Sequence, residues 1–285
     1  MLNFRYHALS LVAVFLSLAI GLLLGVAIGD KGLVSSAESD VRASLRGDVR
    51  QAQAQRDAAR AELQNRQRFE QEAYPGLVGG RLAAKRIALI ELGGTSDRMW
   101  NLTNSALQGS GARLASVSVI REPLQLSSLA ADAHGTRYET LVQEAKLLHP
   151  FGTRIGIQFA EGGALLAAVR HDLLQQGSGT LDGVDGVVLV RDTPTLPKAE
   201  ADRVAAFEDG LVHGLVAANV PVVGVETTDA EVSQIDWFKG HDLSSVDDLD
   251  DLIGRAAVVF VLAGQRGSFG VKASADGGRL PPLLQ

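Results

Sequence analysis

The sequence contains no cysteine among its 285 residues. Disulfide bonds, thiolate metal sites, iron–sulfur clusters and cysteine nucleophiles are therefore all excluded. The absence leaves the redox compartment open, because a chain without thiols is suited to either side of a membrane. Methionine is almost absent as well, with only Met1 and Met99, so the soft sulfur ligands that favour Cu(I) are scarce.

The sequence also lacks an excess of basic residues. Asp and Glu outnumber Lys and Arg by 33 to 27, which gives a formal net charge of −6. A surface that binds phosphates needs excess Lys and Arg, so nucleic acid is not expected as a partner. The apolar and charged fractions, 46% and 21%, are those of a folded chain. The mean hydropathy is only just positive, which argues against several membrane spans.

One segment has no charged side chain at all. Residues 8–28 contain only two clearly polar side chains, Ser10 and Ser17. Because a bilayer core of ~30 Å requires about 20 helical residues, the pattern predicts one transmembrane helix over residues 8–28. Arg5 precedes the span, so the positive-inside rule places residues 1–7 in the cytoplasm and the rest outside the cell membrane. A cleaved signal peptide is the alternative, since Ala27 and Gly29 are small residues suited to a cleavage site.

Small residues recur along this span. Ala13, Ser17, Gly21 and Gly25 are four residues apart and therefore share one side of a helix. Gly21 and Gly25 form a G-x-x-x-G step, and small residues allow two helix backbones to approach closely in lipid. The spacing predicts a helix-pairing face, although small residues are common in membrane helices in general.

A long polar helix is predicted after the span, as a stalk over residues 29–75. Residues 36–72 contain no proline and one glycine, and seven Arg balance seven acidic residues. A thin coiled-coil seam is indicated by 3–4 spacing of Val49, Ala52, Arg56, Ala59 and Leu63. A helix with this many polar side chains gains little stability by burial alone. It is therefore either a stalk that crosses solvent or one half of a helix pair. Together with the small residues of the span, the seam predicts a parallel homodimer.

Proline and glycine predict where this helix ends. The sequence Tyr74-Pro75-Gly76 removes a backbone donor and adds a flexible residue, so we expect the helix to stop there.

From residue 76 to about 270, short apolar runs alternate with amphipathic stretches. This alternation predicts a three-layer α/β domain with a mostly parallel sheet, of Rossmann or flavodoxin type. Strands are expected at residues 86–92, 112–120, 186–190, 220–225 and 255–262, and helices at 97–108, 161–176 and 198–217. The acidic run 247–251 lacks the order of an EF-hand, so we interpret it as the first turn of a short helix over 246–253. Residues 271–285 are expected to form a flexible tail.

Parallel sheets commonly bind ligands at the carboxyl ends of their strands. A possible ligand cleft therefore combines Glu91, Gly93, Gly94 and Thr95 after one strand with Asp192 and Glu226 after two others. A glycine turn that opens a helix can present N–H groups to an anion. This turn matches neither G-x-G-x-x-G nor a Walker A loop, so a simple helix start capped by Thr95 or Ser96 is favoured. No residue spacing indicates a catalytic site, so we expect no enzyme and no evident cofactor.

The six histidines show no local metal motif. No two of them lie within five residues of each other in the sequence. A metal site, whose ligands the sequence leaves unknown, would have to be assembled by the fold. The candidates beyond the span are His134, His149, His171, His213 and His241.

The N-terminal segment combines an Arg-x-His start with an apolar run that contains small residues at a fixed spacing: Arg5, His7, Ser10, Ala13, Val14, Phe15, Leu16, Leu18, Ala19, Gly21 and Gly25. This pattern resembles the N-terminus of the actinobacterial MctB-like and SteB-like proteins. Residues 245–250, followed by 256–262, resemble a second segment of the family, and the layout agrees along nearly the whole chain. For MctB-like proteins, which carry the name copper transporter, the resemblance implies copper efflux or homeostasis at the cell envelope. Copper is implied by this resemblance alone.

SteB-like members imply a different role, the regulation of cell-wall hydrolysis through protein partners without metal transport. A single span cannot line a pore by itself, and the residues show no copper motif. We therefore expect a membrane-anchored envelope protein of copper homeostasis that acts physically as a scaffold, binds an envelope protein partner and carries an α/β binding domain. The SteB-like role is the alternative.

Overall fold

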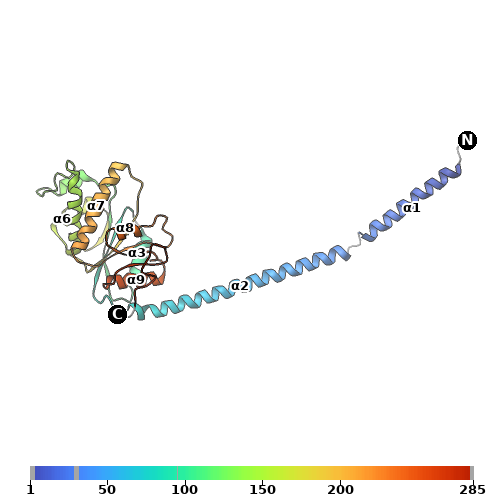
Figure 1. The fold of residues 1–285 in the computed structure, drawn as a ribbon, viewed down its shortest axis with the longest axis horizontal. Helices are drawn as coiled ribbons and strands as arrows, with labels where there is room; N and C mark the ends of the chain where they lie inside the picture. Colours follow the sequence, from blue (N-terminus) through green and yellow to red (C-terminus); the bar gives the residue numbers. More distant parts are fainter. Residues whose placement is uncertain (1–3, 29–31, 95, 283–285) are drawn as a thin grey trace. The chain divides into compact units, whose positions relative to one another are not determined.

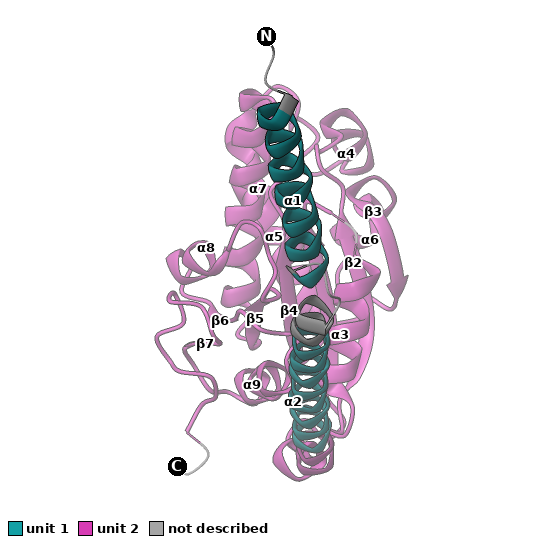
Figure 2. Ribbon diagram, turned by 90° about the vertical axis from the view of Figure 1, so that its right-hand side faces the viewer, with its two compact units in different colours: residues 1–67 teal, residues 68–285 magenta. Residues whose placement is uncertain are grey.

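The structure, a computed structural model, describes residues 4–28, 32–94 and 96–282, with side chains for residues 5–27, 39–94 and 96–282. The chain divides into two compact units, residues 1–67 and residues 68–285 (Figure 2). The predicted site residue Thr95 lies outside the described residues.

The first unit begins with an apolar helix, α1 (Phe4–Ile28). Its residues 5–27 are apolar enough, and the helix is long enough, to cross a membrane. At 1.5 Å per residue, 25 residues extend about 37 Å, which exceeds a bilayer core of ~30 Å. Every described side chain of α1 is exposed, including the apolar ones.

Helix α2 (Gly32–Val78) is 47 residues long and passes through Pro75. The predicted end at residues 74–76 is therefore about one turn too early. Proline removes only one donor, and Gly79 N donates to Pro75 O at 2.9 Å to close the last turn. Tyr74 and Val78 are buried in the second unit, and the Tyr74 hydroxyl donates to Ala106 O at 2.7 Å. Tertiary packing at this end outweighs the helix-breaking tendency of the proline.

The second unit is built on a seven-stranded, mostly parallel sheet, which confirms the α/β class. The strand order is β3-β2-β1-β4-β5-β6-β7, and only β3 runs antiparallel to its neighbour β2. The strands are β1 (Arg86–Leu92), β2 (Arg113–Ile120), β3 (Leu174–Gly179), β4 (Gly186–Arg191), β5 (Val222–Val225), β6 (Ser244–Val246) and β7 (Ser268–Phe269).

Helices cover both faces of the sheet (Figure 1). Ile87 and Leu89 of β1 share a core with the end of α2, α3 (Asp97–Leu107) and α9 (Leu252–Leu262). Ala88 and Ile90, on the other face of β1, share a core with the remaining helices. These are α4 (Leu126–Asp132), α5 (Leu148–Glu161), α6 (Ala164–Leu173), α7 (Lys198–Ala217) and α8 (Ile235–Gly240); a short 3-10 turn, η1 (Ala145–Leu147), precedes α5.

The strand predicted over residues 255–262 is wrong, because these residues form helix α9. Asp251 caps this helix by accepting a hydrogen bond from Ile253 N at 2.8 Å. A continuous apolar run is equally typical of a buried strand and of a helix enclosed by the core, so periodicity alone did not separate them. The strand next to β5 is instead the short β6, which lies just before the helix predicted over 246–253 and overlaps it only at Val246.

The helix predicted over residues 161–176 is also too long. Helix α6 covers Ala164–Leu173, and the next six residues form the antiparallel edge strand β3. By contrast, β1 and α7 have the predicted bounds, and α3 ends one residue early.

Helices α5 and α7 are in direct backbone contact. Each carries two glycines four residues apart, Gly152 and Gly156 on α5 and Gly210 and Gly214 on α7. A Cβ built at Gly156 would overlap the carbonyl oxygen of Leu211, and one at Gly214 would overlap that of Thr153. Small residues four apart were predicted to pair helices at the membrane span. In the α/β unit, glycines with this same spacing allow α5 and α7 to pack closely.

We expect Gly214→Ala to destabilise the second unit. Helix propensity alone would favour Ala by up to about 1 kcal/mol. The overlap with Thr153 O should outweigh this gain, since overpacking a tight contact costs about 1–3 kcal/mol. Thermal unfolding followed by tryptophan fluorescence measures the effect, because both tryptophans, Trp100 and Trp237, lie in this unit.

Gly76→Ala is the matched control, because a Cβ at this helical position meets nothing within 4 Å. Its Tm should be unchanged or slightly higher. A Gly214→Ala Tm equal to that of the control would contradict the backbone contact.

Candidate functional site

The carboxyl ends of β1 and β4 mark the point where the chain reverses its direction of strand addition. Ligand crevices commonly open at such a point. Here the two loops touch instead: Asp192 N donates to Leu92 O at 2.8 Å, and a Cβ at Gly93, which has φ +82, would overlap Asp192 O. Gly94 lies beside the Asp192 carboxylate. Gly93, Gly94 and Asp192 are thus brought together, but as a packed contact.

Glu91 is buried at the end of β1, on the α3 face of the sheet. Its carboxylate accepts a hydrogen bond from Ser96 N at 2.9 Å, and Ser96 Oγ accepts one from Met99 N at 3.2 Å. Ser96 is therefore the N-cap of α3, which confirms the simpler interpretation of this turn. Glu91 and Trp100 line a cavity of about 210 Å³. Burial raises the pKa of Glu91 to about 7, although the Ser96 N–H opposes the shift.

Glu226 lies at the end of β5, two strands from Glu91, and it does not line the cavity that Glu91 lines. The Glu226 carboxylate forms an ion pair with Lys272 Nζ. It also accepts hydrogen bonds from Ser233 Oγ at 2.7 Å and from Gln234 N at 2.6 Å. Its acceptor capacity is used within the chain, so the predicted cleft residues do not form one site.

Sequence analysis missed the charged residues that fill this edge. Arg191, the last residue of β4, donates to Glu208 Oε2 at 2.9 Å and also to Gln234. Its guanidinium lies 4.5 Å from the centre of the Trp237 ring. Glu208 is only 1% exposed, and its Oε1 has no hydrogen-bond partner among the described residues. A charge at the end of an otherwise apolar strand was the available signal.

A second missed acid, Glu122, follows β2. Both of its carboxylate oxygens are buried, and neither has a hydrogen-bond partner within the described parts of the chain. Burial raises the pKa of Glu122 to about 8 and the negative charge of Glu208 adds to the shift, while Arg191 and the nearby backbone N–H of Gly93 oppose it. The edge therefore holds a carboxyl group that stays protonated near neutral pH.

The acids of the run 247–251 are each bound by the chain itself, although Oδ1 of the buried Asp248 has no hydrogen-bond partner among the described residues. Asp247 accepts hydrogen bonds from Val271 N at 2.8 Å and Lys272 N at 3.0 Å, and Asp248 pairs with Arg279 at 3.2 Å. Asp251 caps α9, while the other acids precede the helix instead of forming its first turn. These contacts hold residues 271–279 against the carboxyl ends of β5 and β6.

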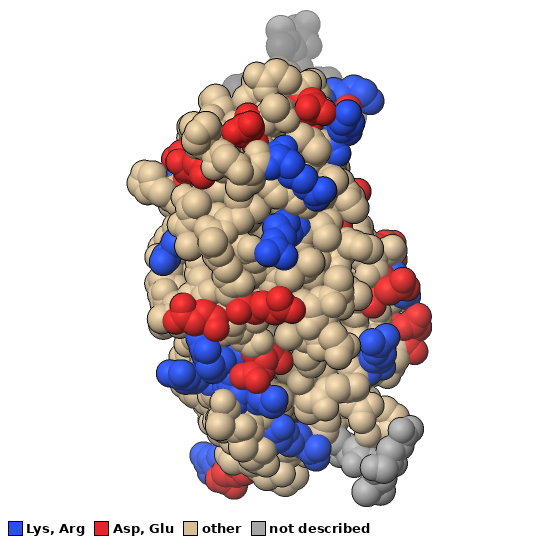
Figure 3. All heavy atoms as spheres, turned by 90° about the vertical axis from the view of Figure 1, so that its left-hand side faces the viewer, with Lys and Arg blue, Asp and Glu red and all other residues tan. Residues whose placement is uncertain are grey.

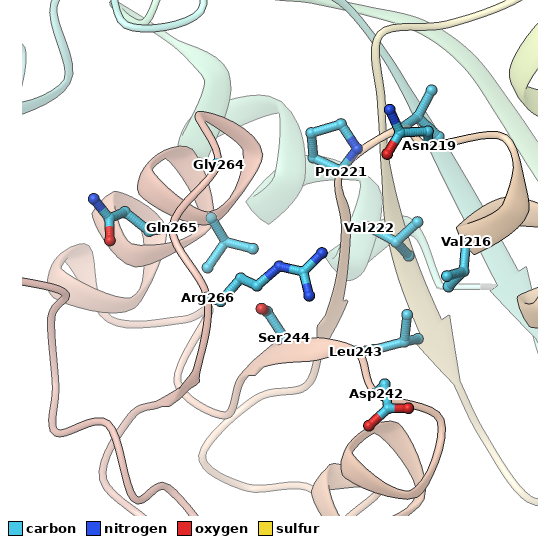
Figure 4. Close-up of a pocket in the computed structure, with 12 residues that line it drawn as sticks. Val216, Asn219, Pro221, Val222, Asp242, Leu243, Ser244, Gly264, Gln265 and Arg266 are labelled. Atoms are coloured by element: carbon cyan, nitrogen blue, oxygen red, sulfur yellow. The ribbon is translucent and has the colours of Figure 1, made fainter.

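A larger cavity, of about 520 Å³, lies at the amino ends of β5 and β6. Figure 4 shows the Arg266 side chain reaching into it between the loop at Gly264 and Val222. Ser244 and Leu243 line the same space. The sequence predicted a cleft only at the opposite edge of the sheet, and no residue pattern indicated this cavity.

On the face seen in Figure 3, Lys and Arg are interspersed with Asp and Glu, without an extended field of one sign.

The histidines do not form a conventional metal centre. Across residues 5–27, 39–94 and 96–282, no group of three or more His, Asp or Glu is placed to hold a metal ion. His241 is engaged at both ring nitrogens, with Trp237 O at 2.8 Å and Asp209 Oδ1 at 2.9 Å. The fold does bring His149 and His213 together, with ring centroids 5.8 Å apart.

On α1, the predicted pairing residues form a shallow apolar groove. Ser17, Gly21 and Gly25 line it, and Ala13 lies one turn before Ser17. The Ser17 hydroxyl donates to Val14 O at 2.9 Å, so it needs no partner outside the helix. A Cβ at Gly21 or Gly25 would meet nothing within 4 Å. The groove is open to a second helix, and pairing itself stays a prediction.

Comparison with known proteins gives concordant matches. The model of the family described as "Copper transport outer membrane protein, MctB" matches residues 1–278. The chain is also similar to the copper transporter MctB of Mycobacterium tuberculosis and of Mycobacterium bovis. The identity is 26% in each case, over alignments that cover 92% of both chains.

We expect Glu122→Gln to stabilise the α/β unit at alkaline pH. The pKa of Glu122 is raised from 4.5 to about 8 in the folded chain. The protonated Glu122 side chain therefore makes its full contribution to the unfolding free energy below pH 4.5, and this contribution is lost as the pH rises to 8. Removing the ionisable group should raise the unfolding free energy at pH 8 by up to about 4 kcal/mol and leave it nearly unchanged at pH 4. Denaturant unfolding at both pH values measures the change.

Glu91 and Asp248, whose pKa values are raised to about 7 and about 6, should leave the variant with a smaller dependence of the same sign. Equal stability of wild type and Glu122→Gln at pH 8 would show that the Glu122 carboxylate is not desolvated.

Proposed function

The chain belongs to the MctB family, and on this premise we propose that it is a single-pass membrane protein of the cell envelope that takes part in copper homeostasis. The observation that carries the proposal is the extent of the family match. Residues 1–278 include α1, α2 and the α/β unit together, so the likeness covers the whole architecture and not one common fold within it.

In the proposed topology, α1 anchors the chain and the α/β unit lies outside the cytoplasm. Helix α1 supports the anchor, because it is long and apolar enough to cross a membrane. Arg5 supports the orientation, because basic residues are retained on the cytoplasmic side.

We further propose that the chain acts as a scaffold, without catalysis and without a conduction path of its own. One helix cannot enclose a pathway for an ion. The chain has no cysteine, and its described side chains include no three-member group suited to a metal. Binding therefore falls to surfaces: the exposed length of α2 and the α/β unit, whose cavity around Arg266 has room for a small ligand or a partner's side chain.

The proposed scaffold is a parallel homodimer. Val49 and Leu63 on α2 are 54% and 53% exposed, so the predicted seam is not covered by its own chain. A long helix that is polar on nearly all sides gains stability mainly by pairing its few apolar positions. The open groove at Gly21 and Gly25 would pair the same two chains within the membrane.

A second candidate is the SteB-like role, in which the same scaffold regulates cell-wall hydrolysis through an envelope protein. The observation that favours it is the exposed apolar surface of α2, which ends with Phe69 at 70% exposure. Such a surface suits a protein partner and involves no metal.

The seam predicts which single cysteines will cross-link, and the natural absence of cysteine makes the experiment clean. Ala59→Cys lies in the seam, whereas Ala61→Cys lies on the outer side of the same helix. Under mild oxidation in native membranes, we expect Ala59→Cys to form a disulfide-linked dimer and Ala61→Cys to remain largely monomeric.

Gly25→Leu in the Ala59→Cys background should reduce the dimer yield, because a large side chain fills the groove of α1. Equal cross-linking of the two cysteine variants would count against the seam. An unchanged yield with Gly25→Leu would remove α1 from the interface.

Copper tolerance tests the proposed function directly. A strain that lacks this protein should tolerate less copper than its parent, and the full chain should restore tolerance. The Gly21→Leu, Gly25→Leu double variant should restore it incompletely, since its pairing face is blocked. Unchanged copper tolerance together with defects in cell-wall remodelling would reject the copper role in favour of the SteB-like one.

A further inference from the structure

We propose that His149 of α5 and His213 of α7 form a two-imidazole site for a divalent transition metal ion, with Cu²⁺ as the preferred ion. The two side chains are exposed, and their ring centroids lie 5.8 Å apart with the ring planes tilted by 46°. The pairing of the rings is read from the fold, whereas the choice of copper rests on the proposed function.

The glycine contact between the two helices holds the histidines in place. A Cβ at Gly210 would overlap the carbonyl oxygen of His149, so the backbone at His149 is pressed against α7 three residues before His213. Both histidines therefore project from packed helices whose relative position is fixed by backbone contact. Ligands on rigid elements lose little freedom when they bind an ion, which favours chelation.

Both imidazoles are available as ligands. Neither ring makes a hydrogen bond or an ion pair with any residue in the described ranges, whereas His241 is engaged at both nitrogens. His134 differs as well, because it lies 3.3 Å from the Glu139 carboxylate. Of the histidines beyond the span, His149 and His213 are the pair that combines free nitrogens with a neighbouring ring.

The separation of the rings suits one shared ion. Imidazole nitrogens bind such ions at about 2.0–2.1 Å, so two nitrogens on one ion lie no more than about 4 Å apart. Ring centres at 5.8 Å permit this, because the coordinating nitrogens are on the ring edges. Imidazole suits Cu²⁺, Zn²⁺ and Ni²⁺, and the Irving–Williams order places Cu²⁺ first.

The site is expected to hold its ion reversibly. No third His, Asp or Glu in the described chain completes a metal group, so water would occupy the other coordination positions. Open positions leave the ion accessible to another ligand. The site is therefore suited to the transient holding of copper, and not to a structural metal.

Copper binding by the full chain in detergent tests the site. One equivalent of Cu²⁺ should give an electron paramagnetic resonance spectrum with coupling to two nitrogens, and calorimetry should give one site per chain. His149→Ala and His213→Ala should each weaken binding by at least about tenfold, the loss that even outer-shell changes cause at metal sites. The double variant should bind no more weakly than either single one, because a chelate is lost when one arm is removed.

His171→Ala is the matched control, because it removes an exposed histidine of the same unit and leaves the pair intact. It should bind Cu²⁺ as the wild type does, and Zn²⁺ should bind the wild type more weakly than Cu²⁺. Unchanged Cu²⁺ binding in both pair variants, or an equal loss in His171→Ala, would overturn the proposal. All variants retain His7 and the amino terminus, so these groups cannot produce a difference between them.

Tryptophan fluorescence during thermal unfolding should show the same Tm for every variant, which separates lost coordination from lost folding. Measured Cu²⁺ binding by the purified chain tests the metal site alone. Copper tolerance of the deletion strain tests the proposed function alone, so the failure of one proposal can be told from the failure of the other.

Discussion

Backbone contact between α5 and α7 is the constraint on which one face of the α/β unit depends. Neither helix can carry a Cβ at the four glycines, so their axes approach more closely than ordinary side chains allow. The aromatic rings flank this line instead of separating the helices, with Phe151 and Phe207 at a centroid distance of 5.9 Å. Residues far apart in the sequence are thereby fixed in register across two helices, His149 and His213 among them.

At the carboxyl edge of the sheet, electrostatic pairing occupies the place where related topologies hold a ligand. Arg191 pairs with Glu208 and Lys272 pairs with Glu226, in each case with the carboxylate almost fully buried. Removing such charges from water is costly, and the ion pairs recover only part of that cost. The unpartnered Oε1 of Glu208 shows where the recovery is incomplete. Ion pairs thus fill much of this edge, which keeps only the cavity of about 210 Å³ beside Glu91 among those described above, and the larger cavity lies at the opposite edge.

Sequence reasoning succeeded where local physics decides the structure. The apolar length of α1, the alternation around β1 and the N-cap at Ser96 act over a few residues, and each was predicted from them. It failed where distant contacts decide. Helix α9 was predicted as a strand because nearly all of its side chains are buried in the protein core, which removes the helical alternation of polar and apolar residues. Helix α2 continues past Pro75 because the Tyr74 side chain is hydrogen-bonded to α3. The predicted cleft named acids at the correct edge of the sheet. It did not include the cationic partners Arg191 and Lys272. Residues that pair between distant loops have no fixed separation in the sequence, so their spacing does not indicate the pair.

The anchoring of Tyr74 and Val78 also determines how α2 can move. Both side chains are buried in the core of the α/β unit, and the Tyr74 hydroxyl is bonded to α3. The last turns of α2 cannot rotate about their own axis without pulling these groups out of the core.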